Sequence, residues 1–261
     1  MTLRGRDEPK LARMTLLQTR TRPVERTAYA VAAVLFLSGL VHLTVLLASG
    51  TTWEGPLSYR KAVTFGLSFG LTLATLAWVT SFLRVTPRAR AALLGAFTVV
   101  SVVEVALVTL QVWRGVPSHF NFETGFDTLV SMTLALGGAV IIAVVLGFTV
   151  AALRTTSGLA PSMLLALRFG LVVLIGALAV GALMIADGVT LSRGGDAQLA
   201  YTTAGALKPV HAVAMHAILV LPALAWLLRF TPWPERRRTR VVQVAAVAYA
   251  LAVAGTWVLF G

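Results

Sequence analysis

The sequence predicts an all-α membrane protein, a bundle of seven transmembrane helices. Of its 261 residues, 57% are hydrophobic and only 12% are charged. The apolar residues come in blocks of about twenty, rather than at the intervals of an amphipathic helix, which is typical of membrane-spanning segments. The distribution of arginine and lysine between these blocks predicts the direction in which the helices cross.

Seven apolar segments are long enough to cross a hydrocarbon core of roughly 30 Å, at about 1.5 Å of rise per residue. We expect spans near residues 28–49, 62–83, 91–113, 127–152, 166–187, 209–228 and 241–260. The first is longer than the apolar core of a signal peptide and follows a long basic tail, which favours a membrane span.

Local features justify the remaining spans in order. The second carries hydroxyls at helical spacing, and the third has a polar face that includes Glu104. Thr124 and Asp127 have the spacing of a helix cap and predict the start of the fourth span. The polar positions on the second and third spans are Thr64, Ser68, Thr72, Thr75, Thr98, Ser101 and Gln111. Ser and Thr hydroxyls within helices usually bond back to carbonyls of their own helix.

The last three spans each carry a distinguishing residue. Arg168 lies inside the apolar run of the fifth span, where its side chain can snorkel to the interface. Pro209 suits the first turn of the sixth span. The seventh has alanines at four-residue spacing, Ala246, Ala250 and Ala254, which favours close helix packing.

The chain divides into a basic tail, residues 1–26, and a seven-helix domain, residues 27–261. Lysine and arginine are retained on the cytoplasmic side of membranes. Most basic residues lie in the tail and in the connections after the second, fourth and sixth spans, whereas the opposite side receives only Arg60, Lys61, Arg114, Arg193 and Lys208. We therefore expect a cytoplasmic amino terminus and an extracytoplasmic carboxyl terminus.

The formal net charge of +12 arises mostly from this asymmetry. It favours contact with anionic lipid headgroups, and we expect no nucleic-acid partner. The chain has no cysteine, which excludes disulfides, thiolate metal sites and cysteine-attached haem. Arginine greatly outnumbers lysine, and alanine, valine and leucine dominate the spans, a bias typical of GC-rich bacterial genomes. We expect a bacterial plasma membrane.

Three ionisable residues from three spans lie at one predicted depth. Counted from the outer helix ends, His42, Glu104 and His216 each lie roughly 10 to 13 Å inside. Ionisable groups at this depth are costly and usually face the interior of a bundle or a water-filled cavity. The sequence therefore predicts a shared polar site.

Further polar residues lie nearer the outer surface. His119, Glu123 and His211 form the predicted mouth of the site, and Asp187 closes the fifth span. The outer loop from Gly188 to Lys208 contains Gly194-Gly195-Asp196 and is a candidate flexible lid.

The predicted site has the chemistry of a metal or haem centre. Imidazole suits zinc, copper and iron, and two histidines with one carboxylate leave coordination positions open. The predicted ligands are His42 and His216, with Glu104 as ligand or catalytic proton acceptor and His119, His211 and Glu123 as secondary ligands. If the centre is haem b, His42 and His216 are the axial ligands. An enzyme built on it would carry out redox chemistry on a small or lipid-soluble substrate, and metal-activated hydrolysis is the variant.

The alternative is a transporter or sensory receptor whose histidines and Glu104 bind a small ligand or protons. No lysine lies deep in any span, which disfavours a retinal Schiff base. The residues leave the reaction, the redox partner and the oligomeric state open.

Two segments resemble recurring patterns in an uncharacterised family of bacterial multi-pass membrane proteins. They are Ser118-His119-Phe120-Asn121 with Phe126-Asp127, and His211 to His216-Ala217 with Leu221-Pro222. The resemblance draws attention to the outer loop and the sixth span, and it implies no particular reaction.

Overall fold

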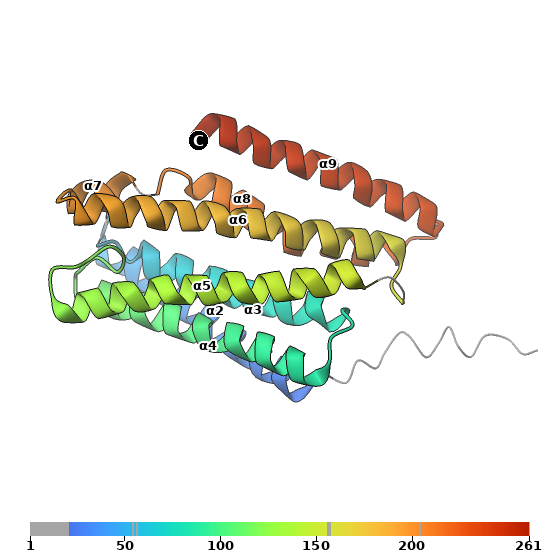
Figure 1. Cartoon of the computed structure of the whole chain (residues 1–261), viewed down its shortest axis with the longest axis horizontal. Helices are drawn as coiled ribbons and strands as arrows, with labels where there is room; N and C mark the ends of the chain where they lie inside the picture. The colour runs from blue at the N-terminus through green and yellow to red at the C-terminus, as the bar shows by residue number, and fades with distance from the viewer. Residues whose placement is uncertain (1–20, 54, 56, 156–157, 204, 261) are drawn as a thin grey trace, which may run out of the picture.

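The structure is a computed structural model that describes residues 21–53, 55, 57–155, 158–203 and 205–260. This part of the chain contains seven helices long and apolar enough to cross a membrane, with one short helix between the fifth and sixth of them (Figure 1). The long helices are α2 (Pro23–Ser49), α3 (Arg60–Ser81), α4 (Pro87–Trp113), α5 (Gly125–Arg154), α6 (Pro161–Arg193), α8 (Lys208–Leu228) and α9 (Glu235–Phe260). The predicted all-α, seven-helix, multi-pass membrane protein is confirmed.

Local chemistry sets the helix starts. Proline occupies the first turn of α2, α4, α6 and α8, where its missing N–H costs no helical hydrogen bond. At the start of α5, the Thr124 hydroxyl accepts a hydrogen bond from the Asp127 backbone N–H at 3.1 Å. The predicted cap and the predicted position of Pro209 are both confirmed.

Helix α2 starts at Pro23, inside the segment that we predicted as tail. Glu25, in its first turn, accepts hydrogen bonds from the backbone and the guanidinium of Arg22. This acidic first turn complements the positive end of the helix dipole, which favours an early start. Residues 1–20 of the predicted tail lie outside the described residues.

The predicted lid is largely helical. Helix α6 continues to Arg193, so Asp187 lies within it, and α7 (Ala197–Thr203) follows. The extra turns of α6 are held by the loop after α4: Ser192 donates to the Phe120 carbonyl at 2.6 Å, and the Phe120 ring packs on Gly188. These contacts fix the start of the predicted lid, although the glycine content of this segment alone indicated a flexible loop.

Two helix pairs pack closely through glycine. A Cβ added to Gly39 of α2 would lie 2.6 Å from the Leu67 backbone nitrogen of α3. A Cβ on Gly170 of α6 would lie 2.9 Å from the Ile218 Cα of α8. Contacts are most extensive in these two pairs, α2 with α3 and α6 with α8, whereas contacts between α3 and α8 are sparse. Close backbone approach at small residues is the usual basis of helix association in membranes.

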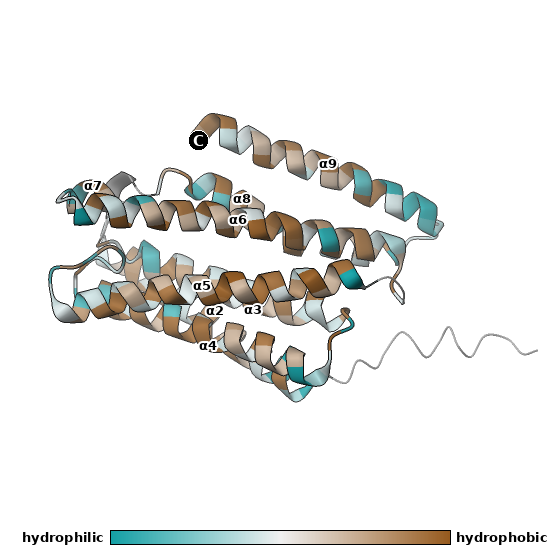
Figure 2. Ribbon diagram, viewed as in Figure 1, coloured by the Kyte–Doolittle hydropathy of each residue, from teal (hydrophilic) through white to brown (hydrophobic). Residues whose placement is uncertain are grey.

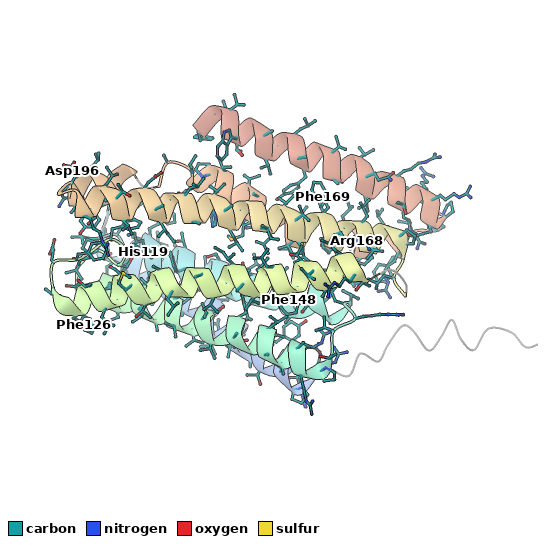
Figure 3. All side chains as sticks on the ribbon, viewed as in Figure 1. His119, Phe126, Phe148, Arg168, Phe169 and Asp196 are labelled. Carbon is teal, nitrogen blue, oxygen red and sulfur yellow. The ribbon has the colours of Figure 1, made fainter. Side chains whose placement is uncertain are left out.

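The bundle has two chemically distinct ends. We call the end formed by Ser49, Arg60, Trp113, Gly125, Arg193 and Lys208 the histidine end, and the opposite end, formed by Pro23, Ser81, Pro87, Arg154, Pro161 and Leu228, the arginine end. Hydrophilic residues concentrate near both ends and apolar residues between them (Figure 2). His119 and Arg168 mark the two ends in Figure 3. The largest apolar core lies toward the arginine end, where it includes Leu76, Phe97, Phe148, Leu167 and Leu221.

Arginine side chains cap helix carboxyl ends at the arginine end. Arg90 of α4 is 1% exposed and donates to the carbonyls of Thr80 at 2.5 Å and Leu83 at 2.8 Å, at the end of α3. Its guanidinium also lies 3.6 Å from the Glu25 carboxylate. Arg168 of α6 donates to the last carbonyls of α5, including that of Thr155 at 2.8 Å. Carbonyls at a helix end lack some of their helical donors, and these guanidinium groups supply additional hydrogen bonds there.

Candidate functional site

A charged network joins α4 to α5 at the histidine end. The Asp127 carboxylate accepts hydrogen bonds from Gln111 at 2.8 Å, from Arg114 at 2.5 Å and from the Thr124 hydroxyl at 2.6 Å. Gln111 and Asp127 are buried, while Arg114 is partly exposed. With three donors on one carboxylate, this network is satisfied and has a structural role.

The loop between α4 and α5 is fixed by hydrogen bonds on both sides. The Ser131 hydroxyl of α5 accepts from the Asn121 N–H at 3.2 Å and donates to the Asn121 carbonyl at 3.0 Å. Phe120 has a φ of 61°, in the left-handed region that non-glycine residues rarely adopt. This conformation costs roughly 1 kcal/mol or more, and the bonds of Ser131 and Ser192 to the loop offset it. The loop therefore holds its neighbour His119 in a defined place.

His119 lies in this loop, between the aromatic ring of Phe65 and the basic residues Lys61 and Lys208. The centroids of the Phe65 and His119 rings are 5.6 Å apart, and the Ser118 hydroxyl lies 2.9 Å from Nδ1. Burial, with the charges of Lys61 and Lys208, lowers the pKa of His119 to about 3. The imidazole is therefore neutral at physiological pH.

His42 has hydrogen bonds to both ring nitrogens. Nδ1 lies 2.7 Å from the Ser38 carbonyl, which can only accept, so Nδ1 carries the proton. Nε2 accepts from the indole N–H of Trp113 at 3.0 Å. The side chain is buried, with 7% of its residue surface exposed. Coordination of a metal or haem iron by His42 would require the Trp113 indole to move.

His211 and His216 each keep one nitrogen as an acceptor. Nδ1 of His211 donates to the Ala177 carbonyl of α6 at 2.7 Å, and Nδ1 of His216 donates to the Ala212 carbonyl of its own helix at 2.6 Å. When such a ring is neutral, the proton on Nδ1 leaves a lone pair on Nε2. No described residue donates to either Nε2 in this structure. His211 packs beside Gly181, whereas His216 is exposed.

A small crevice lies between α3 and α8. Its cavity volume is about 20 Å³, and it is partly open. Its lining combines the His216 imidazole with hydroxyls of α3 and with apolar side chains from both helices: Ser68, Leu71, Thr72, Thr75, Met215, His216, Ile218 and Leu219. Ser68 and Thr75 donate to carbonyls of their own helix, as predicted for such hydroxyls. The crevice thus offers one imidazole acceptor in a mostly apolar surrounding.

Glu104 lies apart from this crevice, at the contact between α4 and α5. The residue is 4% exposed. One carboxylate oxygen fills the space beside Gly137, where an added Cβ would lie only 2.2 Å from it. The hydrogen bonds and ion pairs among the described residues include none to this carboxyl.

The three deep site residues therefore occupy separate surroundings, whereas His211 and His216 lie near each other on α8. His42 bonds to α4, Glu104 faces α5, and His216 faces α3. Within the described ranges, no three His, Asp or Glu side chains are grouped so that they could hold a metal ion. Glu123 is exposed, and its backbone N–H donates to the Asn121 side chain at 3.1 Å.

Sequence reasoning missed Trp113 and Gly137 as partners of site residues. Depth counting does not pair Gly137 with Glu104, because Gly137 lies about 18 Å from the start of its helix and Glu104 about 13 Å from the end of its own. No sequence signal pairs Trp113 with His42 either, since a tryptophan at a helix end is expected to lie in the interfacial belt.

Comparison with known proteins identifies no relative, because no family model, no curated protein and no solved structure matches the chain.

Proposed function

We propose that this integral membrane protein is a receptor or transporter that binds a lipid-soluble small molecule in the crevice between α3 and α8. The observation that carries the proposal is Nε2 of His216, which has no donor among the described residues and lies at a small, partly open crevice lined by hydroxyl and apolar side chains. This nitrogen accepts hydrogen bonds, so the ligand presents a donor such as a hydroxyl or phenol group. Apolar lining with few polar groups is typical of small-molecule sites.

The ligand reaches the crevice from the lipid. His216 is exposed in the isolated chain, as are Leu71 of α3 and Val220 of α8. A bilayer covers such surfaces on a transmembrane helix, and an ionisable residue within a membrane span commonly marks a substrate or ion path. We expect the protein to bind this ligand in the bacterial plasma membrane, with the histidine end on the outer side.

A pair of matched probes tests the proposal. 2-Naphthol carries the hydroxyl donor, and 2-methoxynaphthalene has the same ring system without it. Binding is measured by equilibrium dialysis against purified protein in nanodiscs, with empty nanodiscs subtracted to remove partition into lipid. We expect wild type to prefer 2-naphthol by about fivefold, which corresponds to one net hydrogen bond of about 1 kcal/mol.

The preference should disappear in His216→Leu and persist in His211→Leu, a matched substitution on the same helix outside the crevice. Equal loss in both variants, or no preference in wild type, would overturn the proposal.

A metal or haem centre is the second candidate, because the same lone pair of His216 can coordinate zinc, copper or iron. An absorption spectrum and elemental analysis of the purified protein test it. A Soret band lost in His216→Leu would select haem and redox chemistry, and stoichiometric metal without that band would select a metal site. Colourless, metal-free protein would eliminate both.

A further inference from the structure

Glu104 is an acid inside a membrane span that the crevice does not use. It lies on the face of α4 that packs against α5, one turn beyond Ser101. The residue is 4% exposed, so its carboxyl is largely removed from solvent and lipid. Burial of an ionised carboxylate without a partner is among the most costly arrangements in a protein.

Helix α5 has room for this carboxyl because residue 137 is glycine and has no side chain. A Cβ at Gly137 would lie 2.2 Å from Oε1 of Glu104 and 3.2 Å from its carboxyl carbon. The distance to Oε1 is too short for a methyl group, so alanine at this position would displace the carboxyl, which is the flexible end of the Glu104 side chain. The adjacent Gly138, in contrast, has only Ile185 within 4 Å, at 3.8 Å. The space that the carboxyl occupies, which we call the notch, is therefore formed at Gly137 and not at Gly138.

The nearby polar groups are already bonded elsewhere. The Ser101 hydroxyl donates to the Phe97 carbonyl at 2.7 Å, and the Thr98 hydroxyl donates to the Leu94 carbonyl at 2.7 Å. Neither bond involves Glu104, so the described residues supply its carboxyl with no hydrogen-bond donor.

Charged groups on the helices packed against α4 also have other surroundings. At the histidine end, Asp127 of α5 is bonded by Arg114, His42 of α2 by Trp113, and Lys61 of α3 lies with Arg60 near Lys208 and His119. At the arginine end, Glu25 of α2 pairs with Arg22 and Arg90. The remaining charges on these helices are Arg26, Arg88 and Arg154, all within the first or last turns of their helices at that end. No ion pair between these groups and Glu104 exists among the described residues.

We propose that Glu104 and the notch at Gly137 form a proton-binding site inside the membrane, in which a proton takes the place of a counter-ion. The chemistry favours a proton over a metal cation. Hard cations need several oxygen ligands, and here one carboxyl lies among hydroxyls that donate to helix carbonyls. A proton requires only the carboxylate oxygen itself.

Dicyclohexylcarbodiimide tests the site on the full-length protein in lipid vesicles. This apolar reagent adds to a protonated carboxyl: the acid proton moves to a carbodiimide nitrogen, the carboxylate oxygen bonds to the central carbon, and nothing leaves. Modified peptides are located by mass spectrometry between about pH 5 and about pH 9, a range that brackets ordinary and strongly raised carboxyl values. We expect labelling of Glu104 that decreases as the pH rises. Asp127 and Glu25, which are ion-paired, serve as internal controls and should stay unlabelled.

Two variants separate the notch from mere burial. Glu104→Gln should remove a protonated-carboxyl carbonyl band from the infrared spectrum, which reports the site without any reagent. Gly137→Ala should displace the carboxyl and change its labelling rate severalfold, whereas Gly138→Ala, the matched control, should leave the rate unchanged.

Three results would overturn the proposal: an unlabelled Glu104 with no such infrared band, labelling equally fast in Gly137→Ala and wild type, or protection by sodium chloride relative to choline chloride, which would indicate a sodium site. If Gly137→Ala does not fold, the infrared band and the sodium comparison decide. None of these readouts depends on a ligand in the α3–α8 crevice.

Discussion

The two ends of the bundle handle polar groups in opposite ways. At the arginine end, charged guanidinium groups bond to carbonyls at the ends of α3 and α5, and Glu25 pairs with Arg90. At the histidine end, imidazoles and a tryptophan accompany a single satisfied carboxylate, Asp127. Two imidazole acceptors there have no donor among the described residues, and the Glu104 carboxyl has none at greater depth.

The two ends therefore contribute differently to the stability of the bundle and to its capacity to bind a ligand. Charged donors that satisfy helix ends are costly to remove and leave little binding capacity. Acceptors without a donor can take up a ligand or a proton, because no native hydrogen bond must break first. The arginine end therefore contributes mainly to stability, and the histidine end has the acceptor groups that are available to bind a ligand or a proton.

Arg90→Met should cause the largest loss of stability, because it removes a buried guanidinium that lies beside the Glu25 carboxylate and donates to the carbonyls of Thr80 and Leu83. Breaking a buried ion pair from one side costs roughly 3 to 5 kcal/mol. The measurement is unfolding of purified protein in detergent. Arg88→Met, at an exposed position of the same helix, is the control; equal losses in both would contradict the role assigned to Arg90.

Asp127→Ala should cost less, about 2 kcal/mol, although the carboxylate accepts three hydrogen bonds. Arg114 is 36% exposed and can return to solvent or lipid headgroups, so only Gln111 is left buried without its partner. The same unfolding assay measures the loss. A cost above that of Arg90→Met would reverse the comparison between the two ends.

Acidification should destabilise the histidine end through His119. The pKa of this imidazole in the folded protein, about 3, lies below its ordinary value of about 6.5, because burial and two lysines oppose protonation. The unfolded chain binds a proton first, so stability falls as the pH drops from about 6.5 toward 3, by roughly 2 kcal/mol at pH 5. The difference between wild type and His119→Gln, which does not titrate, isolates this contribution. Parallel pH profiles for the two proteins would contradict the prediction.

Trp113→Phe should have the smallest effect, about 1 kcal/mol, because it removes one neutral hydrogen bond to His42 and keeps an aromatic ring. Trp257→Phe, on an exposed face of α9, is the matched control. The variant also frees Nε2 of His42, which nuclear magnetic resonance of the imidazole nitrogens can detect. An unchanged nitrogen signal would show that the indole does not bond to His42 in the membrane.

The helices were predictable because apolar length and local end signals act within one segment. Thr124 and Asp127 marked the start of α5, and Pro209 marked the start of α8. Depth counting correctly indicated that His42 and Glu104 are buried in the bundle. It could not indicate rotation about the helix axis, which decides that His42 meets Trp113, Glu104 meets Gly137 and His216 meets the polar face of α3.

Hydrophobicity along each continuous segment was sufficient to predict the number of helices, their approximate limits and the depths at which ionisable residues lie. It could not predict that three residues of equal predicted depth have different neighbours, or that the glycine-rich loop is partly helical, which depend on the tertiary structure. Those outcomes depend on which faces pack together, and packing is set by close contacts between distant residues, such as Gly39 with Leu67 and Gly188 with Phe120.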